Sequence, residues 1–321
     1  KEYTKEPSCW QKLGPLNNIA RDRAIPPGTR IRVPANWLKV PAASAEIIFV
    51  QGEVNTQLPG EILKTALEGA KLTIGSRLIT GDGTVSVLFA DGSSLVLEPN
   101  SQLELDALSN FELNGMVDST IRLKRGTVKT RVIKREPRSR FQTITPSAVA
   151  AVRGTEYRVN VGTGKQANDT PQTRVEVYQG LVDVGAEDIK FPVPASFGIV
   201  AKQGEALQAP VKLLDKPTFI NLDEQQLLTL EPSGKAFLPH LIHWQNLELA
   251  SAYQLNILAD DATKSEKLLK SYRTIDTKVN VSDLGVGCYQ LSLRAIDVLG
   301  LHGLAAKQRL CLKQQLSSPF V

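Results

Sequence analysis

The chain has 321 residues and a formal net charge of +5; 42% of its residues are hydrophobic and 22% are charged. This composition is ordinary for a soluble globular protein of two or three domains. No stretch approaches the roughly 20 apolar residues of a membrane span. The mildly basic balance favours anionic partners, such as acidic glycans, lipid head groups or nucleic acid, without choosing among them. No secretory signal is visible at the N-terminus, as expected of a mature or trimmed chain.

Residues 1–41 form the first predicted unit. Residues 10–19 predict a short helix, and the short segment 29–34 predicts a strand. The Pro-Pro-Gly sequence at 26–28 predicts a tight turn between them, because proline presets φ and glycine accepts positive φ.

Residues 42–196 form the second predicted unit, in which apolar and polar residues alternate as in half-buried strands. The segment 84–98 is the clearest case: a strand runs to Phe89, Asp91-Gly92 supplies a hairpin turn, and a second strand returns. Residues 60–72 are the one stretch that could form a helix. The unit is therefore expected to be an all-β sandwich, barrel or solenoid-like roll.

Residues 197–238 are expected to be a connector, and residues 239–321 a second β unit. Six or seven short strands, with Trp244 on an early strand and Tyr289 on a late one, predict a small immunoglobulin-like or fibronectin type III-like sandwich. Cys288 and Cys311 lie in two of these strands. If the strands pair antiparallel, a disulfide worth about 3 kcal/mol is expected; two buried thiols remain the alternative.

Residues suited to catalysis are few. The three histidines, His240, His243 and His302, all lie in the C-terminal region, which excludes a Ser-His-Asp arrangement in the first β unit. His240 and His243 would face opposite sides of a strand, so we expect no metal site there. A carboxylate pair remains formally open among five acids of one region: Asp82, Asp91, Glu98, Glu104 and Asp106. No enzyme activity and no cofactor are expected.

A basic segment runs from residue 124 to residue 140 and contains a single acid, Glu136. It supplies the candidate contacts for an anionic partner: Lys124, Arg125, Lys129, Arg131, Lys134 and Arg135. Lys129 and Arg131 should share one face of a strand. Three interpretations stay open: a solvated strand face, a contact with an anionic protein or glycan, and a nucleic-acid surface, for which aromatic stacking residues are too few.

Two short motifs are expected to be structural. Asp91, Gly92 and Ser93 form the predicted hairpin turn. In the sequence Arg153-Gly154-Thr155, glycine permits a bulge or close backbone approach, and Arg153 has a fork of donors for neighbouring carbonyl groups. We interpret this second motif as a joint where the chain turns a corner; a ligand site is the alternative.

With these motifs in view, residues 46–185 resemble the FecR domain family. The matching stretches, in the family's order, are GSRLITGDGTVSVLFADGSSLVLEPNSQLELD, STIRLKRGTVKTRV, RFQTITPSAVAAVRGTEYRV and TRVEVYQGLVDV. The resemblance implies an all-β, extracytoplasmic module. In iron-uptake signalling, that module is the periplasmic sensor part of an anti-sigma regulator that responds to a TonB-dependent receptor. This chain shows neither the regulator's cytoplasmic segment nor its membrane helix.

The N-terminal segment resembles the second half of a LysM module, a family that binds peptidoglycan and related N-acetylglucosamine glycans. The resemblance implies a short α/β piece whose glycan contacts would be Leu16, Asn17, Ile19, Pro27 and Gly28. The first half of the module, with its usual Gly-Asp-Thr-Leu segment, is missing.

Together, these features predict a mainly β, non-enzymatic protein of the periplasm or another extracytoplasmic space. It would present FecR-like and immunoglobulin-like domains to a protein partner near peptidoglycan, as a scaffold or signal receiver. The alternative is a carbohydrate-binding module with its ligand site on the FecR-like domain. An enzyme with a carboxylate pair is the third hypothesis, and nucleic acid is not the expected partner.

Overall fold

The structure is a computed structural model, and it describes most of the chain from residue 44 to residue 315. The described residues are 9–19, 25–26, 29, 31–33, 44–111, 116–133, 140–152, 154–162, 170–186, 188–220, 222, 225–229, 240–260 and 266–315. The helix α1 (Cys9–Leu16) lies in the predicted N-terminal unit. The other described elements are β-strands, which confirms the mainly β fold class.

Seventeen strands between residues 45 and 212 form two layers that share one long strand, β9 (Met116–Arg131). In the first layer, the open sheet, β9 is joined by β2 (Val54–Gln57), β3 (Lys64–Thr65), β5 (Arg77–Thr80), β8 (Gln102–Phe111), β10 (Arg140–Ile144), β11 (Val149–Val152), β14 (Leu181–Ala186) and β15 (Ile189–Pro194). In the second layer, the docked sheet, it is joined by β1 (Ala45–Gln51), β4 (Lys71–Leu72), β6 (Thr84–Phe89), β7 (Ser94–Leu97), β12 (Glu156–Gly162), β13 (Gln172–Gln179), β16 (Phe197–Lys202) and β17 (Val211–Lys212).

The strand β9 passes from one layer to the other at Gly126. Its first half pairs with β8 and β10, and its second half pairs with β7 and β12. Gly126 has a φ of +86°, and a Cβ atom there would lie 2.4 Å from the Cα of Ser101. Only glycine fits this crossing without a shift of the neighbouring backbone.

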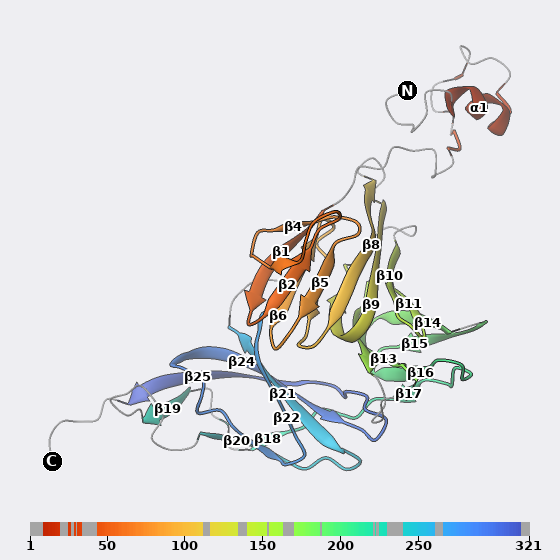
Figure 1. The fold of residues 1–321 in the computed structure, drawn as a ribbon. Coiled ribbons are helices and arrows are strands. Elements are labelled where there is room, and N and C mark those ends of the chain that lie inside the picture. Colours follow the sequence, from red (N-terminus) through yellow and green to blue (C-terminus); the bar gives the residue numbers. More distant parts are fainter. Residues whose placement is uncertain are drawn as a thin grey trace, which may run out of the picture.

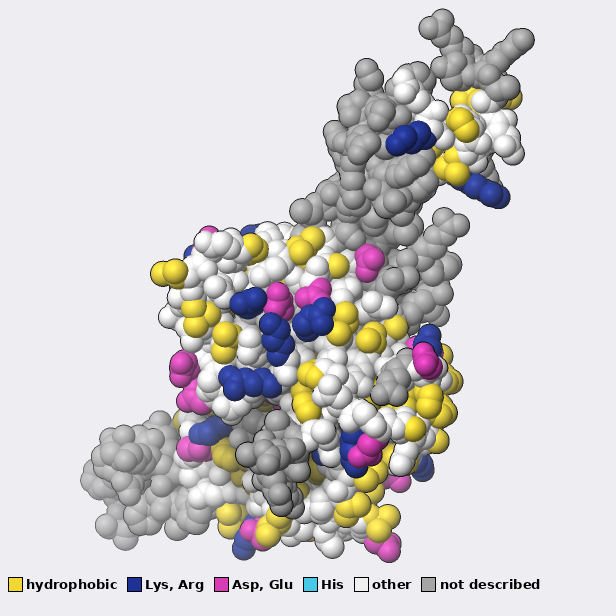
Figure 2. Space-filling view, turned by 45° about the vertical axis from the view of Figure 1, so that its right-hand side comes forward, with side chains coloured by type: hydrophobic (Ala, Val, Ile, Leu, Met, Phe, Trp, Pro, Cys, Tyr) yellow, Lys and Arg dark blue, Asp and Glu magenta, His cyan; other side chains and the backbone are white. Residues whose placement is uncertain are grey.

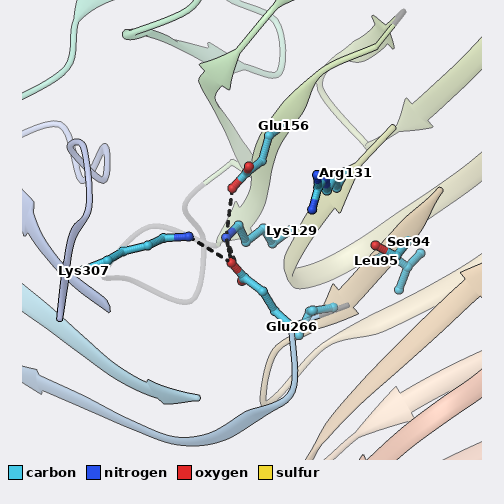
Figure 3. Close-up of a pocket in the computed structure, with 8 residues that line it drawn as sticks. Ser94, Leu95, Lys129, Arg131, Glu156, Glu266 and Lys307 are labelled. Atoms are coloured by element: carbon cyan, nitrogen blue, oxygen red, sulfur yellow. Dashed lines mark hydrogen bonds and ion pairs between the residues drawn. The ribbon is translucent and has the colours of Figure 1, made fainter. Parts of the chain in front are cut away.

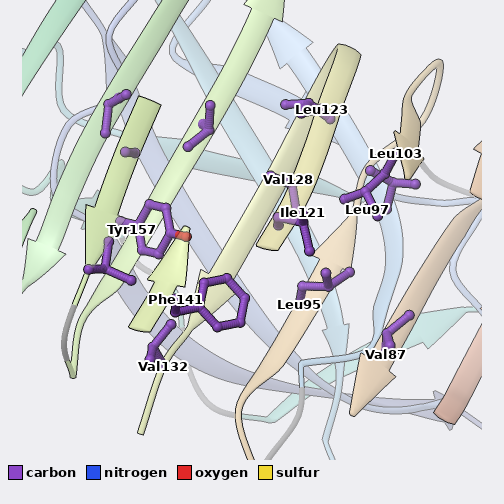
Figure 4. Close-up of a cluster of buried hydrophobic side chains, with 14 of the residues drawn as sticks. Val87, Leu95, Leu97, Leu103, Ile121, Leu123, Val128, Val132, Phe141 and Tyr157 are labelled. Carbon is purple, nitrogen blue, oxygen red and sulfur yellow. The ribbon is translucent and has the colours of Figure 1, made fainter. Parts of the chain in front are cut away.

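The two layers enclose one apolar core (Figure 4). Inward residues of both sheets contribute, and the rings of Phe89 and Phe141 meet edge to face across the layers with centroids 5.4 Å apart. The alternation seen in the sequence identifies the core-facing residues, since Val85, Val87 and Leu97 are fully buried. It does not report that the alternate polar residues Thr84 and Ser86 are buried too. The predicted hairpin is present, with Val87 opposite Leu95 and with Gly92 at a φ of +80°.

Two details differ from the sequence predictions. The stretch 60–72 forms no helix; it contributes β3 and β4, because Ala66 and Leu72 are needed in the sandwich core. The predicted connector 197–238 begins with sandwich strands, since Ile199 and Ala201 of β16 point into the core and β17 pairs with β16. The first sandwich therefore ends at Lys212 rather than at residue 196.

The C-terminal residues form a second two-layer unit, the C-terminal sandwich. One sheet contains β18 (Phe219–Ile220), β20 (Leu241–Trp244) and β23 (Lys278–Asn280). The other contains β19 (Gln225–Thr229), β25 (Ala306–Gln315), β24 (Gly287–Ile296), β21 (Ala252–Ala259) and β22 (Leu268–Thr274), in that order. Trp244 is buried against Tyr253 between the layers. Cys288 and Cys311 face each other on antiparallel strands and are joined by a disulfide.

Candidate functional site

The C-terminal sandwich packs against the outer face of the docked sheet (Figure 1). Hydroxyl groups of β6 donate across this boundary: Thr84 Oγ1 to the carbonyl oxygen of Leu268 at 2.8 Å, and Ser86 Oγ to that of Glu266 at 2.7 Å. At the other end, Arg174 Nε donates to the carbonyl oxygen of Leu299 at 2.6 Å. The contact therefore spans the sheet from β6 to β13.

Lys129 lies at the centre of a chain of ion pairs at this boundary (Figure 3). Its ammonium group is 2.7 Å from both carboxylate oxygens of Glu266 and 3.1 Å from Glu156. Lys307 approaches Glu266 from the other side at 3.6 Å. Burial alone would raise the pKa of Glu266, but the charge and hydrogen bond of Lys129, with the charges of Lys307 and Arg294, together outweigh burial and hold the pKa below its usual value.

A small cavity of about 80 Å³ lies beside these ion pairs and is lined in part by Arg131, Ser94 and Leu95. Small-molecule sites typically occupy roughly 300 Å³ or more. The cavity is therefore too small for a cofactor or sugar, and the ion pairs serve to join the two sandwiches.

A second, largely buried group of charges lies further along the same boundary. Arg158 Nη1 on β12 is 3.2 Å from Glu176 on β13, and Arg158 Nε is 3.6 Å from Glu98. The backbone N–H of His302, from the C-terminal sandwich, donates to Glu176 Oε1 at 3.1 Å. Because Glu176 has no exposed surface, its charge is balanced entirely by neighbouring groups of the protein.

The guanidinium of Arg294 on β24 completes this buried group. It stacks on the ring of Tyr178 with its central carbon 3.7 Å from the ring centroid, and it donates to the carbonyl oxygen of Gly303 at 2.6 Å. Stacking of arginine on a tyrosine ring adds a cation–π attraction that strengthens out of water. The two sandwiches are thus joined by buried, oriented charges, and among the described residues the C-terminal sandwich covers the outer face of the docked sheet where these charges lie.

The open sheet presents a different surface. A mixed group of basic and acidic side chains covers its middle strands (Figure 2). This charged strip consists of Arg77, Glu104, Asp106, Arg122, Lys124 and Arg125. Four cations accompany two acids, and the paired cations are 40–44% exposed while the acids are 20–21% exposed. The acids lie deeper and orient the cations outward, so the accessible charge is positive.

The far half of the open sheet exposes apolar side chains around an ion pair, Asp183 with Lys190 at 3.0 Å. Val149 on β11 and Leu181 on β14 are 38% and 50% exposed, and Pro192 and Pro194 lie on the edge strand β15. The two prolines remove backbone donors from that edge, which discourages the addition of another strand. A partner would therefore contact side chains on this face rather than extend the sheet.

The predicted basic segment does not form one surface. Because β9 changes layer at Gly126, Lys124 and Arg125 lie on the open sheet, whereas Lys129 and Arg131 lie on the docked sheet. Lys124 pairs with Glu104 at 2.8 Å, and Lys129 is held by acids of its own chain. The four described cations therefore lie on two surfaces, and their contact with an anionic partner stays a prediction; Lys134 and Arg135 lie outside the described residues.

The Asp91-Gly92-Ser93 turn is held by its own side chains. Both the backbone N–H and the hydroxyl of Ser93 donate to the Asp91 carboxylate at 2.8 Å, and the N–H of Ile133 donates to Ser93 Oγ at 3.1 Å. The second predicted motif is described only in part. Gly154 has a φ of +71°, and Thr155 is buried. Arg153 lies outside the described residues, so its hydrogen bonds to neighbouring carbonyl groups stay a prediction.

The predicted glycan contacts are also described in part. The amide group of Asn17 donates to the carbonyl oxygens of Leu13 and Arg32 and accepts from the N–H of Arg32, so it ties α1 to the segment 31–33. Leu16 is exposed, and Ile19 is half-buried. Pro27 and Gly28 lie outside the described residues. Glycan binding by this segment stays a prediction.

Sequence reasoning missed the residues that join the two sandwiches, namely Arg158, Glu176, Arg294 and His302. Apolar and polar residues alternate along each strand as expected, but no pattern within a strand indicates that the outward face of the docked sheet is covered by another domain. The signal that could have found it is a row of Lys, Arg and Glu on outward positions of β9, β12 and β13, since opposite charges on neighbouring strands stabilise one another.

Other kinds of site find no support in the part of the chain that the structure describes. There, no group of three or more His, Cys, Asp or Glu side chains could hold a metal ion. His240 precedes β20, and His243 is exposed on that strand; the absence of a metal from these two histidines stays a prediction. Among the described helices, none has the length and apolar character needed to cross a membrane.

Comparison with known structures gives distant likenesses. Two solved structures of a "putative anti-sigma factor" from Parabacteroides distasonis ATCC 8503 share 15% identity, cover 42% of this chain and 57% of that chain, and have a TM-score of 0.34. The extracellular domain of the "putative one component system BT4673" from B. thetaiotaomicron shares 12% identity, covers 78% of this chain and 37% of its own, and has a TM-score of 0.18. The matched region thus spans little more than half of the first relatives.

Comparison with sequence families is more specific. No curated protein matches the chain. Residues 76–183, from β5 to the middle of β14, match the family model described as FecR protein. This range contains the charged strip, the Asp91-Gly92-Ser93 turn, the crossing of β9 at Gly126 and the buried pair of Arg158 and Glu176. The chain therefore carries a FecR domain over residues 76–183.

Proposed function

We propose that this chain is a non-enzymatic, extracytoplasmic protein that receives a protein partner on the open sheet of its FecR domain and takes part in signal reception. The observation that carries the proposal is the asymmetry of the two sheets. The outer face of the docked sheet is occupied by the C-terminal sandwich, whereas the open sheet exposes a charged strip beside apolar residues. Mixed basic and apolar surfaces of this kind suit recognition of a protein with acidic groups.

The extracytoplasmic location is supported by the FecR match and by the Cys288–Cys311 disulfide. Disulfides persist in the periplasm and outside the cell, where the environment is oxidising. The C-terminal sandwich is proposed to be immunoglobulin-like or fibronectin type III-like. Its two-sheet pairing supports this, as does the Tyr289 hydroxyl, which donates to the carbonyl oxygen of Gly285 four residues upstream at 2.9 Å, like a tyrosine corner.

The carbohydrate-binding alternative has less support. Sugar-binding surfaces commonly use exposed aromatic rings, since a ring face packs on the apolar side of a sugar. Among the described side chains, every Phe, Tyr and Trp is buried or half-buried. The LysM-like segment keeps glycan contact open near the N-terminus, separately from the FecR domain.

Two experiments test the proposal. The first introduces a photo-cross-linking residue at Gln142, on the open sheet, or at Gln245, on the exposed surface of the C-terminal sandwich. In cells, adducts with one defined protein are expected from the Gln142 position alone, and they should be lost when Arg122→Glu and Lys124→Glu are added. Equal labelling from both positions, or labelling insensitive to the charge reversal, would contradict the proposal.

The second experiment is co-sedimentation with purified peptidoglycan sacculi, comparing the full chain with a chain that starts near Ala42. If only the full chain sediments, the LysM-like segment anchors the protein to the wall. If both sediment, a glycan site lies in the β domains and the carbohydrate-binding alternative replaces the proposal. If neither sediments, the partner is sought among proteins alone.

A further inference from the structure

His302 lies at the boundary between the two sandwiches, in the connection from β24 to β25. Its backbone N–H donates to Glu176 of the docked sheet, and it forms an isolated bridge with Ile296. The residue is only 6% exposed although its side chain can carry a charge. The proposed partner surface lies on the other sheet, so this histidine has a separate role.

Guanidinium groups from both sandwiches lie next to the partners of His302. Arg158 pairs with Glu176, which accepts from the N–H of His302, and Arg294 donates to the carbonyl oxygen of Gly303, the next residue along the chain. The charges that act on the imidazole are those of Arg158 of β12, Arg174 of β13, Arg273 of β22 and Arg294 of β24. The acids at the same junction are Glu176 of β13, Glu98 of the turn after β7, and Asp297, which follows β24. Glu176 is already paired with Arg158 at 3.2 Å, so the buried charges around the imidazole are mostly positive.

A neutral imidazole fits this environment, and a protonated one does not. Burial removes water from the ring, and the charges of the four arginines disfavour a positive charge on the imidazole. Both effects lower the pKa of His302 well below its usual value, with burial the larger cause. When the sandwiches separate, the ring regains water and the ordinary histidine pKa of roughly 6.5.

We propose that His302 is an acid-sensitive latch: a proton on its imidazole loosens the seating of the C-terminal sandwich on the docked sheet. The latch stands on geometry, since His302 is buried where the two sandwiches meet and its backbone N–H donates across the boundary to Glu176. Arg158 and Arg294 are bonded to Glu176 and to the neighbouring Gly303. It adds a means of regulation to a protein that is proposed to receive a signal. A fall in pH therefore weakens the contact between the two sandwiches directly.

The direction and size of the effect follow from linkage. His302 has the lower pKa in the docked form, so its contribution to docking is complete above pH roughly 6.5 and is lost as the pH falls below it. At pH 5.5 the docking equilibrium loses a factor of about 10 from this one group. Glu176 acts in the opposite direction, because burial raises its pKa and a proton there favours the docked form.

A comparison with His302→Gln separates the two groups. Glutamine keeps the backbone N–H that donates to Glu176 and offers a neutral polar side chain, whereas the titration of Glu176 remains in both proteins. The difference between the two proteins then reports His302 alone.

The test measures hydrogen exchange in the full chain at pH 7.5 and pH 5.5, with rates corrected for intrinsic exchange. The reporter is the amide of residue 302, which bonds across the boundary, and the control is the amide of Leu255, in the buried middle of the C-terminal sandwich. On acidification, the reporter of the wild-type chain is expected to lose about ten times more protection than that of the variant. An equal change in both proteins overturns the proposal.

A pH series on the wild-type chain provides a second test, which decides the matter if His302→Gln fails to fold. Below about pH 6.5, the protection of the amide of residue 302 should fall by up to a factor of about ten per pH unit, while that of Leu255 stays constant. Constant protection of the amide of residue 302 down to pH 5.5 would overturn the latch.

Discussion

Glu176→Gln removes a fully buried carboxylate at the boundary between the two sandwiches. The substitution keeps the size of the side chain and an oxygen that can still accept from the N–H of His302. It leaves the buried guanidinium of Arg158 without its nearest carboxylate, so that the partly exposed Glu98, at 3.6 Å, is its remaining acidic partner. The main consequence is therefore an uncompensated buried charge.

The expected cost is large. Breaking a buried ion pair by removal of one partner typically costs about 3–5 kcal/mol. Burial of the Glu176 carboxylate, which raises its pKa, and the continued presence of Glu98 both reduce this loss, so the expected cost is about 1–3 kcal/mol. Glu104→Gln is the matched control, because Glu104 also pairs with two cations, Arg77 and Lys124, but on the solvent-exposed open sheet. Exposed pairs contribute about 0–1 kcal/mol.

Urea unfolding at pH 7, followed by circular dichroism, measures both changes in the free energy of unfolding. The reasoning is refuted if Glu176→Gln costs no more than Glu104→Gln. A double variant, Arg158→Met with Glu176→Leu, extends the test. It removes both charges, so it should be more stable than Glu176→Gln alone if the cost of the single substitution comes from the unpaired guanidinium.

Three further predictions concern the fold around the site. Gly126→Ala should destabilise the protein by about 3 kcal/mol in urea unfolding, because the new Cβ meets Ser101 at a positive φ, whereas Gly204→Ala, at a positive φ in open space, should cost about 1 kcal/mol. Asp91→Ala should cost about 1–3 kcal/mol by calorimetry, since two donors of Ser93 lose their acceptor, and Asp91→Asn should cost less; equal costs would argue against the turn. Peptide mapping without reductant should recover Cys288 linked to Cys311, and Cys288→Ser with Cys311→Ser should lower stability by about 3 kcal/mol; free thiols in the mature protein would contradict this.

The sequence predicts local structure well wherever alternation and turn chemistry decide it. The hairpin around Gly92 and the strands that contain Trp244 and Tyr253 appear where the pattern places them. In each case the information lies within a few residues: a period of two for the strand, and a residue that accepts positive φ for the turn. The mainly β class follows from the same local signals.

Predictions about the site could not go as far, because they depend on pairs that are distant in the chain. Lys129 is bound by Glu266, 137 residues away, and Arg174 by the carbonyl group of Leu299, 125 residues away. Before such contacts are known, a row of cations on a strand is indistinguishable from a solvated or partner-binding face. The crossing of β9 at Gly126 adds a second obstacle, because it sends Lys124 and Lys129 to different surfaces although they are five positions apart.

The continuity of β9 also has a mechanical consequence. One strand carries Arg122 and Lys124 on the open sheet and, beyond Gly126, Lys129 against the C-terminal sandwich. A pull applied by a bound partner to the first half is borne by the same covalent backbone that positions the second half. With no flexible linker between them to absorb the load, tension at the exposed face is delivered to the ion pairs that hold the C-terminal sandwich.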